Sequence, residues 1–353
     1  MKILHVITSL HIGGAEKLMV DLLPRLKQMG HEVELCVFDG TKTPFYEQLE
    51  ATGVPIHPLS IGESVYNPMH IFRLCRLMKD FDIVHTHNTS PQLFAAIANI
   101  FGKQILITTE HNTTNRRRDK WYLKFGDLWM YRQYKKIICI SDQARENLFN
   151  YIGDDSKVLT VYNGIDVSRF VNANPVVDHD SNYKKITMVS AFRPQKDHKT
   201  LIKAFDLLPD NYLLQLIGDG ELRKEIEDFA KQFSCAVRIC FMGNRSDIPA
   251  ILKGSDVIVL SSHYEGLSLS SIEGMASGAP FIASDVDGLR EIVDSYGILF
   301  PHGEEHALAA SIIKVCEDKQ YARIIADQCQ QRAAQFDIRM MAESYNKVYS
   351  SIL

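Results

Sequence analysis

Short apolar runs alternate along the chain with longer segments that have helical periodicity. Successive positions within a run are apolar, as in parallel strands that are buried on both faces. The first helical segment follows Gly13-Gly14, carries Leu18, Leu22, Leu26 and Met29 on one face, and stops at Gly30. This alternation predicts a doubly wound α/β domain. The strand-like runs of the first half are 2–9, 32–38, 82–86, 104–109 and 136–140.

The alternation pauses at 167–185, which is rich in Asn, Asp, Val and Pro and has no period. We interpret this stretch as a linker between two consecutive Rossmann-like domains, 1–166 and 186–336. A length of 353 residues suits two domains of roughly 100–200 residues each. A final helix is predicted at 337–353, and it is a candidate to cross back onto the first domain. The runs of the second half are 185–190, 212–217, 237–242, 256–260, 280–284 and 297–300.

The composition is that of a globular protein with a sizeable core. Hydrophobic residues make up 46% and charged residues 23%, and a formal net charge of -4 argues against nucleic-acid binding. The seven scattered cysteines include no C-x-x-C, which predicts reduced thiols in a reducing compartment. The N-terminal run is broken by His5 and Thr8, so it indicates a strand and not a secretion signal. No apolar run approaches the length of a membrane span, and we expect a cytoplasmic protein.

Parallel sheets bind ligands beyond the carboxyl ends of their strands, so the loops there are the first places to look for chemistry. Gly13-Gly14 precedes a helix and predicts close approach of an anion to the backbone, or simply a tight turn. The adjacent glycines do not form the dinucleotide G-x-G-x-x-G fingerprint. Arg193 and Lys196 follow the first strand of the second domain, where two cations suit a diphosphate. The alternative for this pair is a solvated surface turn.

The most informative segment is 261–276, a loop and helix that follow the apolar run 256–260. The amides of 266–269 and the helix N-terminus predict a phosphate site. Glu265 and Glu273 are separated by seven residues. Glu273 is a candidate to accept hydrogen bonds from a ribose. It also completes a capping box that begins at Ser270, which requires no ligand and is the safer interpretation.

At this point the residues resemble a known family, the retaining GT-B glycosyltransferases of family 4. Glu265 to Glu273 match its E-x7-E signature, although Ser268 stands where many members have glycine. The motifs run in order over almost the whole chain. The other matching segments are Gly13-Gly14-Ala15-Glu16, Glu110-His111-Asn112, Val161-Tyr162-Asn163-Gly164-Ile165-Asp166, Ile217-Gly218-Asp219-Gly220 and Phe241-Met242-Gly243.

The resemblance implies a GT-B fold, in which two Rossmann-like domains face a central cleft. It implies retaining transfer from a nucleotide-diphosphate sugar, UDP by family frequency, to a glycan or polyprenyl lipid-linked acceptor. Capsule, lipopolysaccharide or another surface polysaccharide is the expected pathway, and no metal or cofactor is expected. The implied catalytic residues are His111 and Glu265. The implied donor-binding residues are Gly14, Arg193, Lys196, Gly243, Gly266, Leu267, Ser268, Leu269 and Glu273, and the acceptor-side residues are Gly13, Glu16 and His87.

Two patterns resemble metal sites and are set aside. Asp285-Val286-Asp287 is an Asp-x-Asp, but it lies past the signature helix. His85-Thr86-His87 ends a strand, and we expect its two imidazoles on opposite sides of that strand, where they cannot share an ion.

The stretch 116–136 combines eight Lys and Arg with two Asp, and it contains both tryptophans of the chain. Cationic and aromatic residues on a helix predict contact with an anionic membrane surface, here the inner face of the cell membrane. The alternative is a helix that packs its aromatic residues on the core and exposes its charges.

Three other functions remain to be weighed. A nucleotide-sugar epimerase can share the GT-B fold, but its motifs differ from those at 265–273. An NAD-dependent oxidoreductase would need the fingerprint that both first strands lack. A non-catalytic nucleotide-sugar-binding protein is disfavoured by the intact set of candidate residues, although fold alone does not prove activity.

Overall fold

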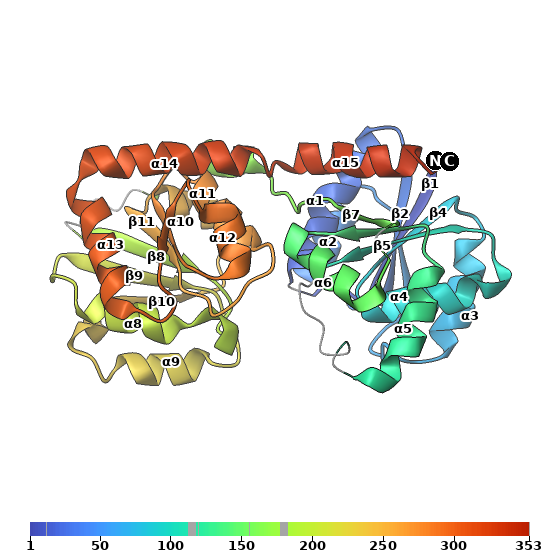
Figure 1. Ribbon diagram of the computed structural model, residues 1–353, viewed down its shortest axis with the longest axis horizontal. Helices are drawn as coiled ribbons and strands as arrows, with labels where there is room; N and C mark the ends of the chain where they lie inside the picture. Colours follow the sequence, from blue (N-terminus) through green and yellow to red (C-terminus); the bar gives the residue numbers. More distant parts are fainter. Residues whose placement is uncertain (12, 112–117, 119, 155, 177–182, 353) are drawn as a thin grey trace. The chain divides into compact units, whose positions relative to one another are not determined.

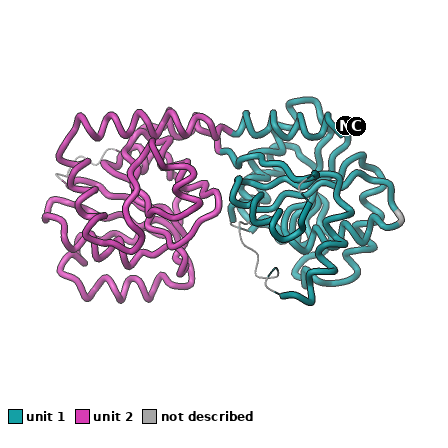
Figure 2. The backbone as a smooth tube through the Cα atoms, viewed as in Figure 1, with its two compact units in different colours: residues 1–164, 338–353 teal, residues 165–337 magenta. Residues whose placement is uncertain are grey.

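A computed structural model describes residues 1–353 except 12, 112–117, 119, 155, 177–182 and 353. The chain forms two compact units, one made of 1–164 with 338–353 and the other of 165–337 (Figure 2). Each unit contains one parallel sheet with helices connecting its strands (Figure 1). The predicted pair of Rossmann-like α/β domains is therefore confirmed.

The sheet of the first unit has seven strands in the order β3-β2-β1-β4-β5-β6-β7. The strands are β1 (Lys2–Ile7), β2 (Glu32–Asp39), β3 (Ile56–Ser60), β4 (Ile83–His87), β5 (Ile105–Glu110), β6 (Lys136–Cys139) and β7 (Val158–Thr160). The helices are α1 (Gly14–Gln28), α2 (Pro44–Glu50), α3 (Met69–Met78), α4 (Thr89–Ala98), α5 (Lys124–Arg132), α6 (Asp142–Ile152) and α15 (Ile338–Ser350), with the short 3-10 turns η1 (Asn99–Phe101) and η2 (Trp121–Leu123).

The sequence pattern missed the two edge strands, β3 and β7. Each pairs with one neighbour only, and most of their residues are only partly buried. Pro58 lies inside β3, a residue that sheets tolerate only at an edge. The continuous apolar runs that identify central strands are therefore absent from both.

The strands of the first unit are buried on both faces because alternate side chains enter separate cores. Ile3 and Ile7 of β1 pack with residues of α1, α2 and α15. Leu4 and Val6 of the same strand pack with residues of α3 to α6. Helix α1 contributes its predicted leucines, but Met29 caps its C-terminus and is 39% exposed. The predicted place of Met29 on the buried face is therefore wrong.

The C-terminal helix α15 belongs to the first unit although the chain reaches it from the second (Figure 2). Its apolar face is buried in the core that contains α1. Near the start of the helix, the Sδ atom of Met341 lies 3.2 Å from the backbone nitrogen of Gly164. The buried residues of the helix are Ile338, Met341, Ala342, Tyr345, Val348 and Tyr349.

The sheet of the second unit has six strands in the order β10-β9-β8-β11-β12-β13. The strands are β8 (Lys184–Val189), β9 (Tyr212–Ile217), β10 (Ile239–Gly243), β11 (Val257–Leu260), β12 (Phe281–Ser284) and β13 (Ile298–Phe300). The helices are α7 (Val167–Val171), α8 (His198–Asp206), α9 (Arg223–Ala230), α10 (Ile248–Lys253), α11 (Leu269–Ala276), α12 (Asp287–Val293), α13 (Glu305–Glu317) and α14 (Lys319–Ala334), with the 3-10 turns η3 (Pro194–Lys196) and η4 (Ser234–Arg238).

The stretch 167–185, predicted as a linker, differs from that expectation in its described part. It opens with α7, whose Val167 and Phe170 are buried, and α7 contacts α10 and α11. A helix of five residues is too short to show a period, so the sequence pattern could not reveal it. Residues 177–182 of the stretch lie outside the described residues.

Two further findings concern features weighed from the sequence. All seven cysteines are free thiols, and Cys240 is exposed. Within the described residues, no helix combines the length and apolarity that a membrane span requires.

Replacing Tyr345 of α15 by Ala should destabilise the first unit by about 3–5 kcal/mol, because this fully buried ring fills the core that α15 shares with α1 and β1. Both tryptophans lie in the first unit, so urea unfolding followed by their fluorescence reports on this unit. The matched control is Met340→Ala on the same helix, where the side chain is 52% exposed and a change below about 0.5 kcal/mol is expected. Equal effects of the two substitutions would contradict the docking of α15.

Candidate functional site

Both sheets reverse their strand order at one point, and the candidate residues gather there. In the second sheet the reversal lies between the neighbours β8 and β11, and in the first between β1 and β4. Ligands of open α/β sheets bind at such switch points, beyond the carboxyl ends of the strands. Each unit therefore has one candidate site, and each is described by itself.

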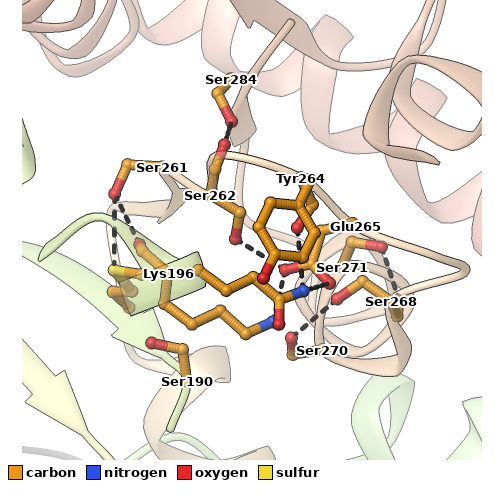
Figure 3. A network of polar contacts seen from close by, with 12 residues as sticks. Ser190, Lys196, Ser261, Ser262, Tyr264, Glu265, Ser268, Ser270, Ser271 and Ser284 are labelled. Carbon is orange, nitrogen blue, oxygen red and sulfur yellow. Dashed lines mark hydrogen bonds and ion pairs between the residues drawn. The ribbon is translucent and has the colours of Figure 1, made fainter. Parts of the chain in front are cut away.

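Glu265 is the centre of the site in the second unit (Figure 3). It follows β11, its side chain is 6% exposed, and Lys196 forms an ion pair with its Oε1 atom. The hydroxyl of Ser262 donates to the same oxygen at 2.6 Å. The amide of Gln195 donates to Oε2 at 3.3 Å and to the carbonyl oxygen of Tyr264 at 2.9 Å. The carboxylate is therefore fixed by three donors from two loops.

The resemblance assigned Lys196 to donor binding and Glu265 to catalysis, and the structure brings the two side chains into direct contact. A paired ammonium has less charge to offer a diphosphate. Arg193, three residues earlier, is exposed at the start of η3. Its guanidinium has no recorded hydrogen bond or ion pair within the described part of the chain.

Helix α11 begins two residues earlier than a capping box would require. Its N-cap is Ser268 in extended conformation, without a side-chain cap. The hydroxyl of Ser271 donates to the carbonyl oxygen of Ser268 at 2.7 Å, and the hydroxyls of Ser268 and Ser270 lie 3.1 Å apart. Glu273 is therefore in the fifth helical position and cannot reach back to an N-cap. The capping-box interpretation is wrong, and the first amides of α11 have no intrahelical acceptor.

Two close approaches between backbones hold the loops of this site. A Cβ atom on Gly288 would lie 2.3 Å from the carbonyl oxygens of Glu265 and Gly266. One on Gly218, which has a φ of +134°, would lie 2.0 Å from the carbonyl oxygen of Ser190. The glycines let α12 pack against the Glu265 loop and the β9 loop against the β8 loop. Leu267 and Ser268 are buried, whereas Gly266, Leu269 and Glu273 are partly buried.

Gly243 lies at the end of β10, which is at the edge of the same sheet. Its φ of +65° suits glycine, and a Cβ there would lie 3.2 Å from Nη1 of Arg223. The carbonyl oxygen of Gly243 accepts from the amide of Gly218 at 2.9 Å. Its assigned donor role stays a prediction.

The site of the first unit is built on a row of buried histidines. The rings of His85 and His87 stack with centroids 4.6 Å apart, and His5 stacks on both. The expectation that His85 and His87 point to opposite sides of the strand is wrong. Residues i and i+2 of a strand share a face, and only Thr86 between them points the other way.

The same parity explains the whole row. β1 is paired with β4, and β4 with β5. His5 of β1 lies opposite His85 of β4, and His87 of β4 lies opposite Thr109 of β5. His111 is two residues beyond Thr109. All of these side chains therefore lie on the sheet face that α15 covers.

Hydrogen bonds link the row from His111 to α15. Nε2 of His111 lies 2.9 Å from Nδ1 of His87, and Nε2 of His87 lies 3.0 Å from Nδ1 of His5. The hydroxyl of Tyr349 lies 3.4 Å from Nε2 of His5 and 2.7 Å from Nδ1 of His85. The other end of the row, Nδ1 of His111, is buried and has no hydrogen-bond partner among the described residues.

The glycine loop after β1 lies beside this row, on a neighbouring strand end. Gly13 is the extended N-cap of α1, and a Cβ there would lie 2.2 Å from Oε2 of Glu16. Burial raises the pKa of Glu16, and hydrogen bonds from its own backbone and from Asn88 oppose the shift. Asn88 has a φ of 71° and donates to the hydroxyl of Thr8 at 2.9 Å. Gly14, assigned to the donor, lies in this unit and not with the other assigned donor residues.

Comparisons with known proteins match two family models to successive parts of the chain. The family model described as Glycosyltransferase Family 4 matches residues 12–169, and the one described as Glycosyl transferases group 1 matches 172–335. The two models together span almost the whole chain, and the chain belongs to the glycosyltransferase family that they describe.

Known relatives and solved structures resemble the chain over nearly its full length. The UDP-Gal:alpha-D-GlcNAc-diphosphoundecaprenol alpha-1,3-galactosyltransferase of Escherichia coli is 25% identical, covering 90% of this chain and 89% of that protein. The GalNAc-alpha-(1->4)-GalNAc-alpha-(1->3)-diNAcBac-PP-undecaprenol alpha-1,4-N-acetyl-D-galactosaminyltransferase of Campylobacter jejuni is 25% identical, covering 100% of this chain and 99% of that protein. The crystal structure of Anabaena Alr3699/HepE in complex with UDP-glucose has a TM-score of 0.87 at 21% identity and covers 100% of both chains.

Several site residues of this glycosyltransferase were missed by sequence reasoning. Ser262 and Gln195 hold Glu265, and Asn88 contacts Glu16. His198 lies 3.0 Å from the hydroxyl of Ser190 and stacks on Phe192 at 4.3 Å. For Ser262 and Asn88 the available signal was a polar residue just after a strand's carboxyl end, but many surface loops share it. Gln195 and His198 lie farther along their loop and gave no such signal.

The Asp-x-Asp pattern is paired with an arginine. Nε of Arg290 lies 2.6 Å from Asp285, and its Nη1 lies 3.2 Å from Asp287. All three side chains are at least 39% exposed. This local pairing gives the two aspartates a partner that is not a metal.

Glu110 anchors the strand end that carries His111. Its carboxylate accepts from Gln92 at 2.6 Å and from Tyr131 at 2.8 Å, and Arg118 pairs with it at 3.2 Å. The Arg118 side chain is only 10% exposed. The sequence suggested that Arg118 belongs to an exposed basic face, and this is wrong. The buried carboxylate of Glu110 pairs with its guanidinium and holds it inside the unit. Asn112, Arg116 and Arg117 lie outside the described residues.

The buried histidines of the first unit are held neutral. Burial lowers the pKa of His111 to about 4 and that of His5 to about 3, and it lowers the pKa values of His85 and His87 well below 6.5. Charge on a neighbouring histidine adds to the shift for His5, His85 and His87. A neutral His111 has one donor and one acceptor nitrogen, and its tautomer decides which is which.

The first unit should lose stability as the pH falls from 6.5 to about 4. In this window an unfolded histidine binds a proton and His111 or His5 in the folded unit does not, so acid favours the unfolded state. Each such histidine contributes up to about 1.4 kcal/mol per pH unit. Urea unfolding followed by tryptophan fluorescence should show a shallower slope in His5→Asn and the wild-type slope in His306→Asn, an exposed histidine of the other unit. A wild-type slope in His5→Asn would contradict a depressed pKa at His5.

Proposed function

We propose that the chain transfers a sugar from a UDP-sugar to a lipid-linked glycan acceptor, with retention of anomeric configuration. Surface polysaccharide synthesis is the proposed pathway. The observation that carries the proposal is the preorganised carboxylate of Glu265 beside the N-terminus of α11, at the switch point of the second sheet. A carboxylate held in place in this way can accept hydrogen bonds from the hydroxyls of a sugar.

The leaving diphosphate is assigned to Arg193 and to the first amides of α11. An exposed guanidinium offers a planar fork for phosphate oxygens, and a helix N-terminus favours an anion. When the hydroxyls of a donor sugar donate hydrogen bonds to Glu265, they weaken its ion pair with Lys196. The ammonium of Lys196 can then also bind the diphosphate. Fixed cations and amides stabilise the charge that develops on the leaving group, so the proposed transfer needs no metal at the diphosphate.

The acceptor is assigned to the first unit. His111 is proposed to contact the transferring sugar, with its free Nδ1 as the group available to substrate. Gly13, Glu16 and His87 form the acceptor side, and Glu273 is assigned to the ribose. The relatives named above support a lipid-linked acceptor, because the Escherichia coli and Campylobacter jejuni enzymes carry undecaprenol in their names.

Two readings compete with this proposal. A non-catalytic binding protein would keep the donor site but not the transfer, and sugar transfer measured with candidate acceptors separates the two. A nucleotide-sugar epimerase would convert its donor without any acceptor, so incubation with UDP-sugar alone distinguishes it.

UDP should raise the melting temperature of the protein, with or without Mg²⁺, more than GDP or ADP does. Arg193→Ala should weaken UDP binding and lower turnover about 100-fold or more, since it removes a charge that stabilises the leaving group. The matched control is Arg323→Ala, which removes an exposed arginine of α14 and should change neither. Stabilisation by NAD alone would contradict the proposed activity, and unchanged turnover would remove Arg193 from the site.

We also propose that the first unit contacts an anionic membrane, peripherally and on the cytoplasmic face. Trp121 and Phe125 are 81% and 83% exposed on η2 and α5. Lys120 and Lys124 flank them and are also solvent-accessible. Aromatic rings surrounded by cations suit the headgroup region of a bilayer, which a lipid-linked acceptor would occupy.

Vesicles rich in phosphatidylglycerol should shift the tryptophan fluorescence to the blue at low salt. The signal is specific because Trp121 and Trp129 are the two tryptophans of the chain. Phe125→Ser should weaken binding about tenfold or more, since it removes a ring that would leave water. Phe72→Ser is the matched control, an aromatic residue that is 68% exposed on α3. An absence of any shift at low salt would rule out this contact.

A further inference from the structure

Three metal-ligating side chains converge at the carboxyl edge of the second sheet, and none has been assigned a role above. Asp197 precedes α8 in the loop after β8, His263 follows β11, and His302 follows β13. Single ligand atoms of the three all lie within 4.8 Å of one another. They come from three separate loops, so no local sequence pattern connects them.

The two imidazoles of this cluster face each other. Nδ1 of His263 lies 2.6 Å from Nε2 of His302, and their rings meet edge to face with centroids 4.9 Å apart. Oδ2 of Asp197 lies 3.7 Å from the same Nδ1 atom. Both histidines are exposed, the side chain of His263 by 44%, so an ion can reach them from solvent.

Asp197 supplies the observation that points to a ligand. Its side chain is 7% exposed, and its Oδ1 atom caps α8 by accepting from the amide of Thr200 at 3.2 Å. Its Oδ2 atom is buried and has no hydrogen-bond partner among the described residues. A buried carboxylate oxygen without a donor is costly, so such an atom calls for a cationic partner.

We propose that Asp197, His263 and His302 bind a divalent ion of the zinc class. Two imidazoles and a carboxylate are a known ligand set for zinc, with a fourth position left for water. Zinc–ligand bonds of about 2.1 Å put tetrahedral ligand atoms roughly 3.4 Å apart. Nδ1 of His263 lies 2.6 Å from Nε2 of His302 and 3.7 Å from Oδ2 of Asp197, one distance shorter and one longer than that spacing. Small side-chain rotations would therefore bring the three atoms to the spacing that zinc requires. Magnesium prefers oxygen ligands and would not select this set.

The ion lies beside the proposed donor site and takes no part in the proposed transfer. Lys196 precedes Asp197 in the chain, and Glu265 is two residues after His263. The carbonyl oxygen of Gln195 accepts from the amide of His263 at 2.8 Å, which joins the two loops. The bound ion would tie the loops of Lys196, Glu265 and β13 together. The family resemblance led us to expect no metal, and a zinc site here departs from that expectation while remaining compatible with Mg²⁺-independent binding of UDP.

The histidine row of the first unit also places three ligand atoms within 4.8 Å, at His5, His85 and His87. Those rings are fully buried, and both nitrogens of His85 already have hydroxyl partners at 2.7 and 2.8 Å. An ion there would break several buried hydrogen bonds. An ion at the Asp197 site would replace the single hydrogen bond between His263 and His302, and it would give Oδ2 of Asp197 the partner that it lacks among the described residues.

The test is zinc titration of the full chain after removal of metal by a chelator, in competition with a chromogenic zinc indicator. The wild type should bind one ion per chain and melt at a higher temperature when it is bound. His302→Ala should weaken this binding about tenfold or more, given that even outer-shell substitutions cost about 10–100-fold. Asp197→Asn should also weaken it, while Asn keeps an oxygen for the cap on α8. Cobalt in place of zinc should give the intense visible bands of a four-coordinate site.

His306→Ala is the matched control, an exposed histidine on the neighbouring helix α13 that should leave zinc affinity and the cobalt spectrum unchanged. Unchanged melting temperatures of the metal-free variants show that each is folded. The proposal is overturned if the wild type binds no stoichiometric zinc, or if His302→Ala binds zinc as the wild type does. Neither result depends on nucleotide binding, so failure of the zinc site and failure of the proposed transferase activity remain distinguishable.

Discussion

Parallel strand pairing is the constraint on which both sites depend. A parallel strand must be followed by a crossover that returns the chain to the other end of the sheet, so every strand delivers its following loop to the same edge. Where the strand order reverses, adjacent loops diverge and leave room for a ligand. In the second unit this brings together Lys196 and Glu265, which are 69 positions apart in sequence. In the first it aligns β1, β4 and β5, whose ends carry the glycine loop, His87 and His111.

The two sites handle buried polar groups in different ways. The second unit buries an ion pair, Lys196 with Glu265, and surrounds the carboxylate with the further donors Ser262 and Gln195. The first unit buries imidazoles that remain neutral, and it hydrogen-bonds them to one another and to Tyr349. A buried charge must be paired, whereas a neutral ring needs only one donor and one acceptor. The charged arrangement holds one carboxylate in place, and the neutral one leaves Nδ1 of His111 without a hydrogen-bond partner among the described residues.

Helix α15 connects the fold of the first unit to its candidate chemistry. It closes the core over β1 and supplies the hydroxyl of Tyr349 to the histidine row, so the last helix of the chain completes a site built from its first strand. In the second unit two glycines have this role. Gly218 lies against the backbone of Ser190, and Gly288 lies against the backbone of Glu265, at distances that leave no room for a side chain. In both units, residues that are distant in the sequence hold the candidate residues in place through packing.

The sequence by itself determined the central strands, the two α/β domains, the glycosyltransferase family and most of the loops that carry candidate residues. These depend on local signals: continuous apolar runs, glycines after a strand, and a spaced pair of glutamates. Only the tertiary structure revealed the edge strands β3 and β7, helix α7, the start of α11 at Leu269 and the inward position of Arg118. It alone paired Lys196 with Glu265 and grouped Asp197 with His263 and His302. The reason is physical, because partial burial removes the apolar signal from an edge strand, and contacts between distant loops leave no period or spacing in the chain.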